Sequence, residues 1–382
     1  MDPSLRLAVE LPPVPAHRAT APASLAPWWQ LVLAAVRAGA GVVWFTGGAG
    51  EGEGGSGQGE GGSGQGAGRG ASQGAGRGAG RGAGLACDAC TIAAAAITLQ
   101  DAALLGVVSM LPVDRHPAVL ARDVTTLDVA SGGRAAVLLR WARSGGLGQP
   151  STGPRGEVPG EPPDACTYLG EAVAVCRSVL GNDVPVFDGE YLHVAGAVNR
   201  PSPRRPGGPP IFVEVPTRAA GLVRREVGPG FLLRQASSAA ATIVCPDDPG
   251  EIALWRDFAE ESTESLRSGD DVSRGPDVVC RATLRHAWAG ATTRSLKAPT
   301  LTGSSPGSGP EPSPGSGSEP SPGSGPLSGL RARLDAARAA GASGVIIRVP
   351  SVRRGGGTLP LEDDDAQALV AELAECFEPW RR

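Results

Sequence analysis

The sequence lacks a surplus of positive charge. Its 35 Lys and Arg residues face 39 Asp and Glu residues, which gives a formal net charge of -4 and a pI near 5.7. This balance provides no broad cationic field of the kind that attracts phosphate backbones or anionic lipid surfaces. We therefore expect neither nucleic acid nor a membrane among the partners of this protein.

A secretion signal and an unbroken apolar run are also missing. The start, MDPSLRLAVELPP, has an early acid, no basic segment, and Pro residues where a signal peptide needs an apolar core. The most apolar region, Leu85–Pro112, is interrupted by Asp88, Gln100 and Asp101, whose burial in hydrocarbon would be costly. These features predict a cytoplasmic protein.

The cysteines do not form the pattern of a disulfide framework. There are seven, an odd number, and they are scattered and mostly set in apolar runs, which favours reduced thiols in a core. Cys87 and Cys90 have C-x-x-C spacing, but neither a second Cys pair nor a His pair accompanies them. We predict no metal site.

Glycine and proline, by contrast, are abundant, with 57 and 35 residues, and they are concentrated in a few stretches. These stretches hold few apolar side chains that could offset the entropy lost on ordering them. We therefore expect three disordered inserts in one folded domain that spans residues 1–382. The inserts are Gly47–Gly84, Ser144–Asp164 and Thr302–Ser328.

Outside the inserts, apolar strand-like runs alternate with helical patterns, which is typical of parallel β/α units. The number of strand candidates is eight, the number that closes a β/α barrel. The sequence thus predicts an α/β protein with a (β/α)8 TIM barrel. The candidate strands are Leu5–Leu11, Gly41–Phe45, Ala103–Met110, Ala135–Trp141, Ile211–Val215, Ala241–Cys245, Val278–Leu284 and Val345–Val349.

Three helices are recognisable from their ends and their apolar spacing. Pro117–Val129 begins with Pro and is followed by Gly132, and Leu330–Ala340 stops before Gly341. Near the C-terminus, the acids Asp363–Asp365 precede apolar residues spaced four apart, which predicts a final amphipathic helix.

Two ordered segments resemble the luciferase-like monooxygenase family. RHPAVLA at 115–121, followed by SGGR at 131–134, resembles the connection between the third and fourth barrel strands of that family. FDGEY at 187–191, with the proline-rich stretch 201–211, resembles its hairpin and its entry into strand five. The resemblance implies a β/α barrel that binds reduced FMN or the deazaflavin coenzyme F420 across the C-terminal mouth, where such barrels place their chemistry.

The resemblance also implies positions for the cofactor. In this family the third strand ends in a bulge, commonly with a non-proline cis peptide, and Gly106, Val107, Val108 and Ser109 match it. The alternative is an ordinary buried strand in which Gly106 allows close packing. We also expect cofactor contacts from Arg140, near the end of strand four, and from Thr217 and Arg218, which follow strand five.

Three stretches depart from the family pattern. Strand two runs from Trp44 directly into the Gly-rich insert, where relatives usually carry an acid or a His. The bulky pair Arg140 and Trp141 stands where the family tends to have small residues, so we expect it to narrow the mouth of the barrel. Pro216 removes one backbone N–H from the turn that usually helps to hold phosphate, so we expect Arg218 to compensate through its charge.

The catalytic candidates are His17, which follows strand one, and Glu10, at the C-terminal end of that strand. Their alternatives are an exposed loop histidine and a paired surface carboxylate. His116 is expected to cap the helix that follows it. Trp28 and Trp29 fit either a substrate wall or, as adjacent aromatics at a helix start more often do, the edge of the core.

The sequence therefore leads to one functional hypothesis and one rival. The hypothesis is a flavin- or F420-dependent oxidoreductase that acts on a small organic substrate, by oxygen insertion or by hydride transfer. The sequence is compatible with a homodimer but does not establish one. The rival is a barrel that has lost catalysis and serves as a ligand-binding or scaffold protein. It is motivated by the Gly tract that replaces the polar contacts after Thr46.

Overall fold

A computed structural model describes the barrel and the helices around it. The described residues are 5–13, 26–47, 88–98, 103–111, 115–141, 164–181, 184–216, 228–266, 276–284, 326–349 and 363–381. The three predicted inserts lie almost entirely outside these ranges, so their predicted disorder stays a prediction. The third prediction was three residues too long, because a helix already begins at Pro326.

Eight strands form a closed parallel barrel in the order β1, β2, β3, β4, β7, β8, β9, β10, and β10 pairs back onto β1. Each strand overlaps one of the eight predicted ranges, so the predicted (β/α)8 TIM barrel is confirmed. The strands are β1 Leu7–Glu10, β2 Val42–Thr46, β3 Leu104–Leu111, β4 Ala135–Trp141, β7 Ile211–Glu214, β8 Thr242–Pro246, β9 Val278–Thr283 and β10 Val345–Arg348.

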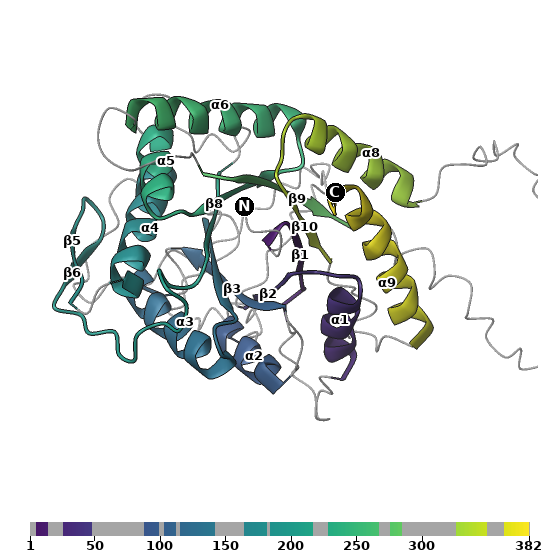
Figure 1. Ribbon diagram of the computed structural model, residues 1–382, viewed down its shortest axis with the longest axis horizontal. Helices are drawn as coiled ribbons and strands as arrows, with labels where there is room; N and C mark the ends of the chain where they lie inside the picture. The colour runs from purple at the N-terminus through teal and green to yellow at the C-terminus, as the bar shows by residue number, and fades with distance from the viewer. Residues whose placement is uncertain are drawn as a thin grey trace, which may run out of the picture.

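Helices surround the barrel, and α1 lies beside α9, so that helices from the two ends of the chain meet (Figure 1). Within the described residues, none of the helices combines the length and the apolar character needed to span a membrane. The helices are α1 Ala26–Arg37, α2 Ala89–Ala95, α3 Pro117–Ser131, α4 Ala165–Gly181, α5 Gly228–Ser238, α6 Pro249–Leu266, α8 Pro326–Ala339 and α9 Asp363–Phe377, with short 3-10 turns at Ala96–Thr98 and Glu378–Trp380.

Helix α3 shows why its ends could be predicted. His116 is the N-cap, and its Nδ1 accepts a hydrogen bond from the backbone N–H of Ala118 at 3.2 Å. Pro117 occupies the first turn, where a missing N–H costs nothing. Gly132 ends the helix in the left-handed conformation, with φ of 77°. The expected capping role of His116 is confirmed.

The core has two parts because strand residues point alternately into the barrel and out toward the helices. The larger part lies between strands and helices, and six described cysteines with free thiols are in or beside it. The smaller part fills the lumen with side chains such as Trp44, Leu138 and Phe212, all fully buried. The lumen is thus a packed core at the level of these residues.

Strand β3 corrects one expectation. It pairs without interruption with β2 and β4, and the peptide bonds of Gly106–Ser109 are trans, so the predicted bulge with a cis peptide is absent from this described strand. The ring of Trp44 occupies the space that a Cβ at Gly106 would need. Gly106 therefore serves close packing in a regular strand, which was the alternative reading of the sequence.

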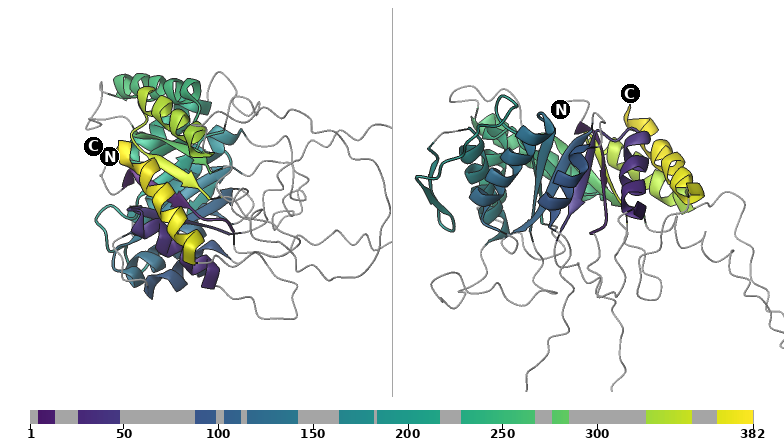
Figure 2. Two further views of the ribbon diagram at one scale, coloured as in Figure 1. Left: turned by 90° about the vertical axis from the view of Figure 1, so that its right-hand side faces the viewer. Right: turned by 90° about the horizontal axis from the view of Figure 1, so that it is seen from below.

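A small antiparallel hairpin, β5 Val186–Asp188 and β6 His193–Ala195, lies outside the ring of helices beside α4 (Figure 2). Its turn is held by the carboxylate of Glu171 in α4, which accepts backbone hydrogen bonds from Glu190, Tyr191 and Leu192 at 2.6, 2.9 and 2.8 Å. A buried carboxylate needs such donors, because burial without them is costly. Glu171 therefore holds the turn of the hairpin, and the buried side chains of Leu192 and Val194 join it to the core.

Candidate functional site

A layer of charged side chains lies at the C-terminal end of the barrel. Parallel strands all end on the same side, and residues two apart on a strand point the same way. Five strands have an apolar lumen residue followed, two positions later, by a charged residue. The pairs are Ala8 and Glu10, Leu138 and Arg140, Phe212 and Glu214, Val279 and Arg281, and Ile346 and Arg348.

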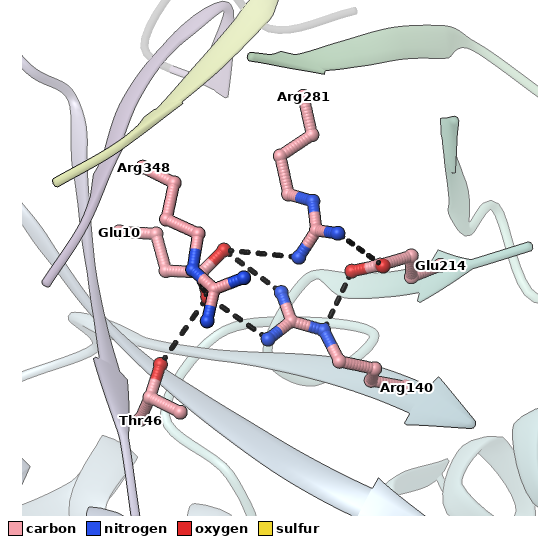
Figure 3. Close-up of polar contacts among 6 residues, drawn as sticks. All are labelled: Glu10, Thr46, Arg140, Glu214, Arg281 and Arg348. Atoms are coloured by element: carbon pink, nitrogen blue, oxygen red, sulfur yellow. Dashed lines mark hydrogen bonds and ion pairs between the residues drawn. The ribbon is translucent and has the colours of Figure 1, made fainter. Parts of the chain in front are cut away.

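Arg140 is at the centre of this layer (Figure 3). Its Nη1 and Nη2 donate to Oε1 and Oε2 of Glu10 at 2.9 and 2.8 Å, and its Nε donates to Oε2 of Glu214 at 2.6 Å. Glu10 and Arg140 are both almost fully buried. The planar guanidinium therefore joins β1, β4 and β7 through charge-assisted hydrogen bonds, which are stronger than hydrogen bonds between neutral groups.

Arg281 and Arg348 form the more open side of the layer. Arg281 donates to Oε1 of Glu214 at 2.9 Å, and its Nη1 lies 3.6 Å from Oε2 of Glu10. The Nε of Arg348 lies 3.6 Å from Oε1 of Glu10. Their side chains are 21% and 24% exposed, whereas that of Arg140 is 3% exposed. These two arginines are therefore the cations of the layer that solvent reaches.

The surrounding arginines determine the charge of Glu10. Burial by itself would raise the pKa of this carboxyl, but the positive charges of Arg140, Arg281 and Arg348, with the Arg140 hydrogen bond, lower it to about 2. Thr46 adds a longer contact, with Oγ1 3.4 Å from Oε1. Glu10 thus carries a negative charge at neutral pH. A carboxylate held in this way suits positioning of the arginines rather than proton transfer.

The predicted site residues fall into three groups. Glu10 and Arg140 lie in the mouth of the barrel and contact each other. His17, Thr217 and Arg218 lie outside the described residues, as does Cys87.

The third group, Gly106–Ser109, lies on β3 beneath and behind the charged layer. Gly106 and Val108 belong to the lumen side, and the lumen next to Gly106 is filled by the Trp44 ring. Val107 faces the helices, as Leu105 and Leu111 do. Ser109 lies two residues after Val107, so its side chain also points outward, and it is buried. Among these predicted residues, Arg140 therefore lies in the charged layer, whereas the side chains of Val107 and Ser109 point away from the lumen.

The aromatic candidates belong to the core. Trp28 packs against Phe45 with ring centroids 5.3 Å apart, and its indole N–H donates to the Pro12 carbonyl at 3.2 Å. Trp141 points outward and meets Tyr168 edge-on. Trp28 thus covers the edge of the core, and Trp141 does not narrow the mouth.

Sequence reasoning missed Thr46, Glu214, Arg281 and Arg348. Each lies within or directly at the end of a correctly predicted strand, so the signal was present. A charged residue two positions after an apolar lumen residue, repeated on five strands, indicates a polar layer at the mouth. The repetition becomes visible only when the strands are compared in register.

The comparisons with known proteins agree with this architecture. The profile of the luciferase-like monooxygenase family matches residues 73–293, which is more than half of the chain. No curated protein matches it at a significant level. Among solved structures, the monooxygenase RslO1 from Streptomyces bottropensis is similar, with a TM-score of 0.51 and 15% identity, over 98% of this chain and 99% of that one.

Two further solved structures are more distant. One is the coenzyme F420 dependent tetrahydromethanopterin reductase from Methanopyrus kandleri, with a TM-score of 0.47 and 15% identity, over 73% of this chain and 67% of that one. The other is the EDTA monooxygenase from Chelativorans sp. BNC1, with a TM-score of 0.44 and 14% identity, over 73% and 64%. On the strength of the profile match and the closed barrel, this chain belongs to the luciferase-like monooxygenase family.

Proposed function

We propose that this protein is an oxidoreductase that binds FMN or F420 at the C-terminal mouth of its barrel and acts on a small organic substrate there. The observation that carries the proposal is the family match over residues 73–293, within which β4, β7 and β9 contribute Arg140, Glu214 and Arg281 to the charged mouth. Barrels of this kind place their chemistry at that end.

The charged layer is compatible with such a cofactor. Three guanidinium and two carboxylate groups give these five side chains a net charge of +1. Both FMN and F420 are anionic, and a positive mouth attracts anions over several ångströms. The packed lumen at Trp44 and Gly106 leaves no space for a tricyclic ring, so the ring would lie above the layer. Arg140, Arg281 and Arg348 are the described residues that would face it.

The residues of the chain would contribute electrostatics and positioning. When bound, the reduced cofactor would supply the reducing equivalent for oxygen insertion or for hydride transfer. Glu10 and Glu214 hold Arg140 from two sides, so its charge is fixed in place before a ligand arrives. The apolar residues beneath the layer exclude water from below. With a pKa of about 2, Glu10 is ionised at neutral pH and is a weak base, so its role in this proposal is to position Arg140.

One observation favours the rival function, a ligand-binding barrel without catalysis. Of the two predicted acid–base groups, Glu10 is the one within the described residues, and its carboxylate is already engaged by arginines. A barrel with this mouth would still bind an anionic molecule. The rival predicts binding without turnover.

Titration of the purified protein with FMN and with F420, followed by fluorescence, separates the two functions. Micromolar binding of one cofactor, with oxidation of its reduced form accelerated by a substrate, supports the enzyme. Arg140→Met should weaken that binding, whereas Arg331→Gln, in an exposed pair between α8 and Glu375 of α9, should not. Binding of neither cofactor would refute the proposal.

A further inference from the structure

The open side of the charged layer is built like a receptor for a small anion. Arg281 and Arg348 are contributed by the neighbouring strands β9 and β10, which pair in parallel. Figure 3 shows their guanidinium groups gathered with that of Arg140 around the Glu10 and Glu214 carboxylates. Two cations placed side by side repel each other unless negative charge lies between or beside them. Glu10 provides part of that charge.

The two carboxylates do not satisfy one nitrogen of Arg281. Glu10 is shared by all three arginines, and its Oε2 lies 3.6 Å from the Nη1 of Arg281, which is longer than a hydrogen bond. The Nη1 of Arg281 is buried and has no hydrogen-bond acceptor in the described part of the chain. A buried guanidinium N–H without an acceptor is costly. An anion that accepts from it would remove this cost.

The residues beneath Arg281 and Arg348 limit how deep in the barrel a bound anion can lie. Directly below Arg281 and Arg348 lie Val279 and Ile346, which are buried and apolar. An anionic head would therefore meet the guanidinium groups and could not pass below them. Guanidinium groups match the planar, two-oxygen geometry of a carboxylate particularly well.

We propose that Arg281 and Arg348 form a subsite for the carboxylate of the substrate, so that this protein acts on small organic acids. This inference rests on the proposed function in one respect, because only an enzyme has a substrate. The binding of an anion by the two arginines does not depend on that function. Glu10 and Glu214 are the positioning residues of the subsite, because they hold the arginines without contacting the anion.

The subsite can be tested with acetate and its neutral analogue acetamide as probes, because the two differ mainly in charge. Their binding to the full-length protein is measured by NMR titration with the 13C-labelled compounds at constant ionic strength, which keeps screening equal. We expect acetate to bind at least about tenfold more tightly than acetamide. Equal binding of the two probes would overturn the proposal.

Variants locate the binding. Arg281→Gln and Arg348→Gln should each weaken acetate binding about tenfold, whereas Arg281→Lys, which keeps the charge, should weaken it less. Arg331→Gln is the control and should leave it unchanged. Thermal unfolding and circular dichroism show whether each variant is folded, and Arg281→Lys keeps the test valid if a Gln variant is not. Acetate binding unchanged in every mouth variant would refute the subsite.

A second comparison separates the substrate from the cofactor phosphate as the source of the anion. Reduced FMN and reduced riboflavin, which lacks the phosphate, are titrated against the wild type and Arg281→Gln. If Arg281→Gln changes the affinity for both flavins to a similar extent, the result supports the substrate subsite. If it weakens the binding of FMN alone, the result overturns the subsite in favour of a phosphate site. Acetate binding without binding of FMN or F420 would defeat the proposed oxidoreductase function and leave the anion subsite supported.

Discussion

Arg140 and Glu10 form a two-pronged ion pair inside the barrel, with N–O distances of 2.9 and 2.8 Å, although 130 residues separate them in the sequence. Both side chains are at most 3% exposed. Two charges taken out of water in this way are stable only if each keeps its partner. The pair therefore links β1 to β4, and the arrangement of the charged side chains at the mouth depends on it.

Arg140→Met should destabilise the protein by about 3–5 kcal/mol, because it leaves the buried Glu10 and the partly buried Glu214 with less compensating charge. Urea unfolding followed by circular dichroism measures the change. In Arg331→Gln, the lost ion pair with Glu375 is exposed, with both side chains 52% accessible. Its effect should be below about 1 kcal/mol. Equal effects of the two substitutions would show that the buried pair has no special role in stability.

The second prediction concerns acid. The pKa of Glu10 is lowered from 4.5 to about 2 in the folded protein, so folding is favoured by the ionised form. The resulting stabilisation is complete above pH 4.5 and disappears as the pH falls from there to about 2. It amounts to about 3 kcal/mol. Between pH 6 and pH 2, the wild type should lose that much more unfolding free energy than Glu10→Gln. Parallel pH curves for the two proteins would contradict the assignment.

The strands were predictable because a parallel barrel buries both faces of each strand. Such strands appear in the sequence as short apolar runs, and Ala135–Trp141 and Val345–Arg348 stand out for that reason. The ends of α3 were predictable because capping is local chemistry of His116, Pro117 and Gly132. The bulge predicted at 106–109 was wrong because it was carried over from the family resemblance, whereas β3 pairs regularly with both of its neighbours.

The candidate site was predictable only in part. Glu10 and Arg140 were both selected from the sequence, but for different roles, and nothing local indicates that they pair. Their contact depends on the register of several strands, which a single sequence does not reveal. Arg281 and Arg348 resemble ordinary residues at strand ends until the barrel closes and places β10 between β1 and β9.

Gly106→Ala tests the packing of the lumen. The new methyl group would overlap the Trp44 ring, which is fully buried and cannot move away, so we expect a loss of about 1–3 kcal/mol. In a Trp44→Leu background, the same substitution should cost less, because the six-membered part of the indole is gone. Gly181→Ala is the control, since a Cβ there meets no atom within 4 Å. Equal costs of Gly106→Ala in both backgrounds, measured by urea unfolding, would disprove the contact.

Glu171→Gln should loosen the β5–β6 hairpin while leaving the barrel folded. Three backbone N–H groups, those of Glu190, Tyr191 and Leu192, donate to the two carboxylate oxygens of Glu171, and an amide offers only one acceptor oxygen. We expect a loss of about 1–3 kcal/mol and faster hydrogen exchange at residues 190–192, because these amides lose their acceptor. Glu260→Gln, an exposed change on α6, should alter neither quantity. Exchange at 190–192 as slow as in the wild type would mean that other contacts hold the turn, and that Glu171 is buried for a different reason.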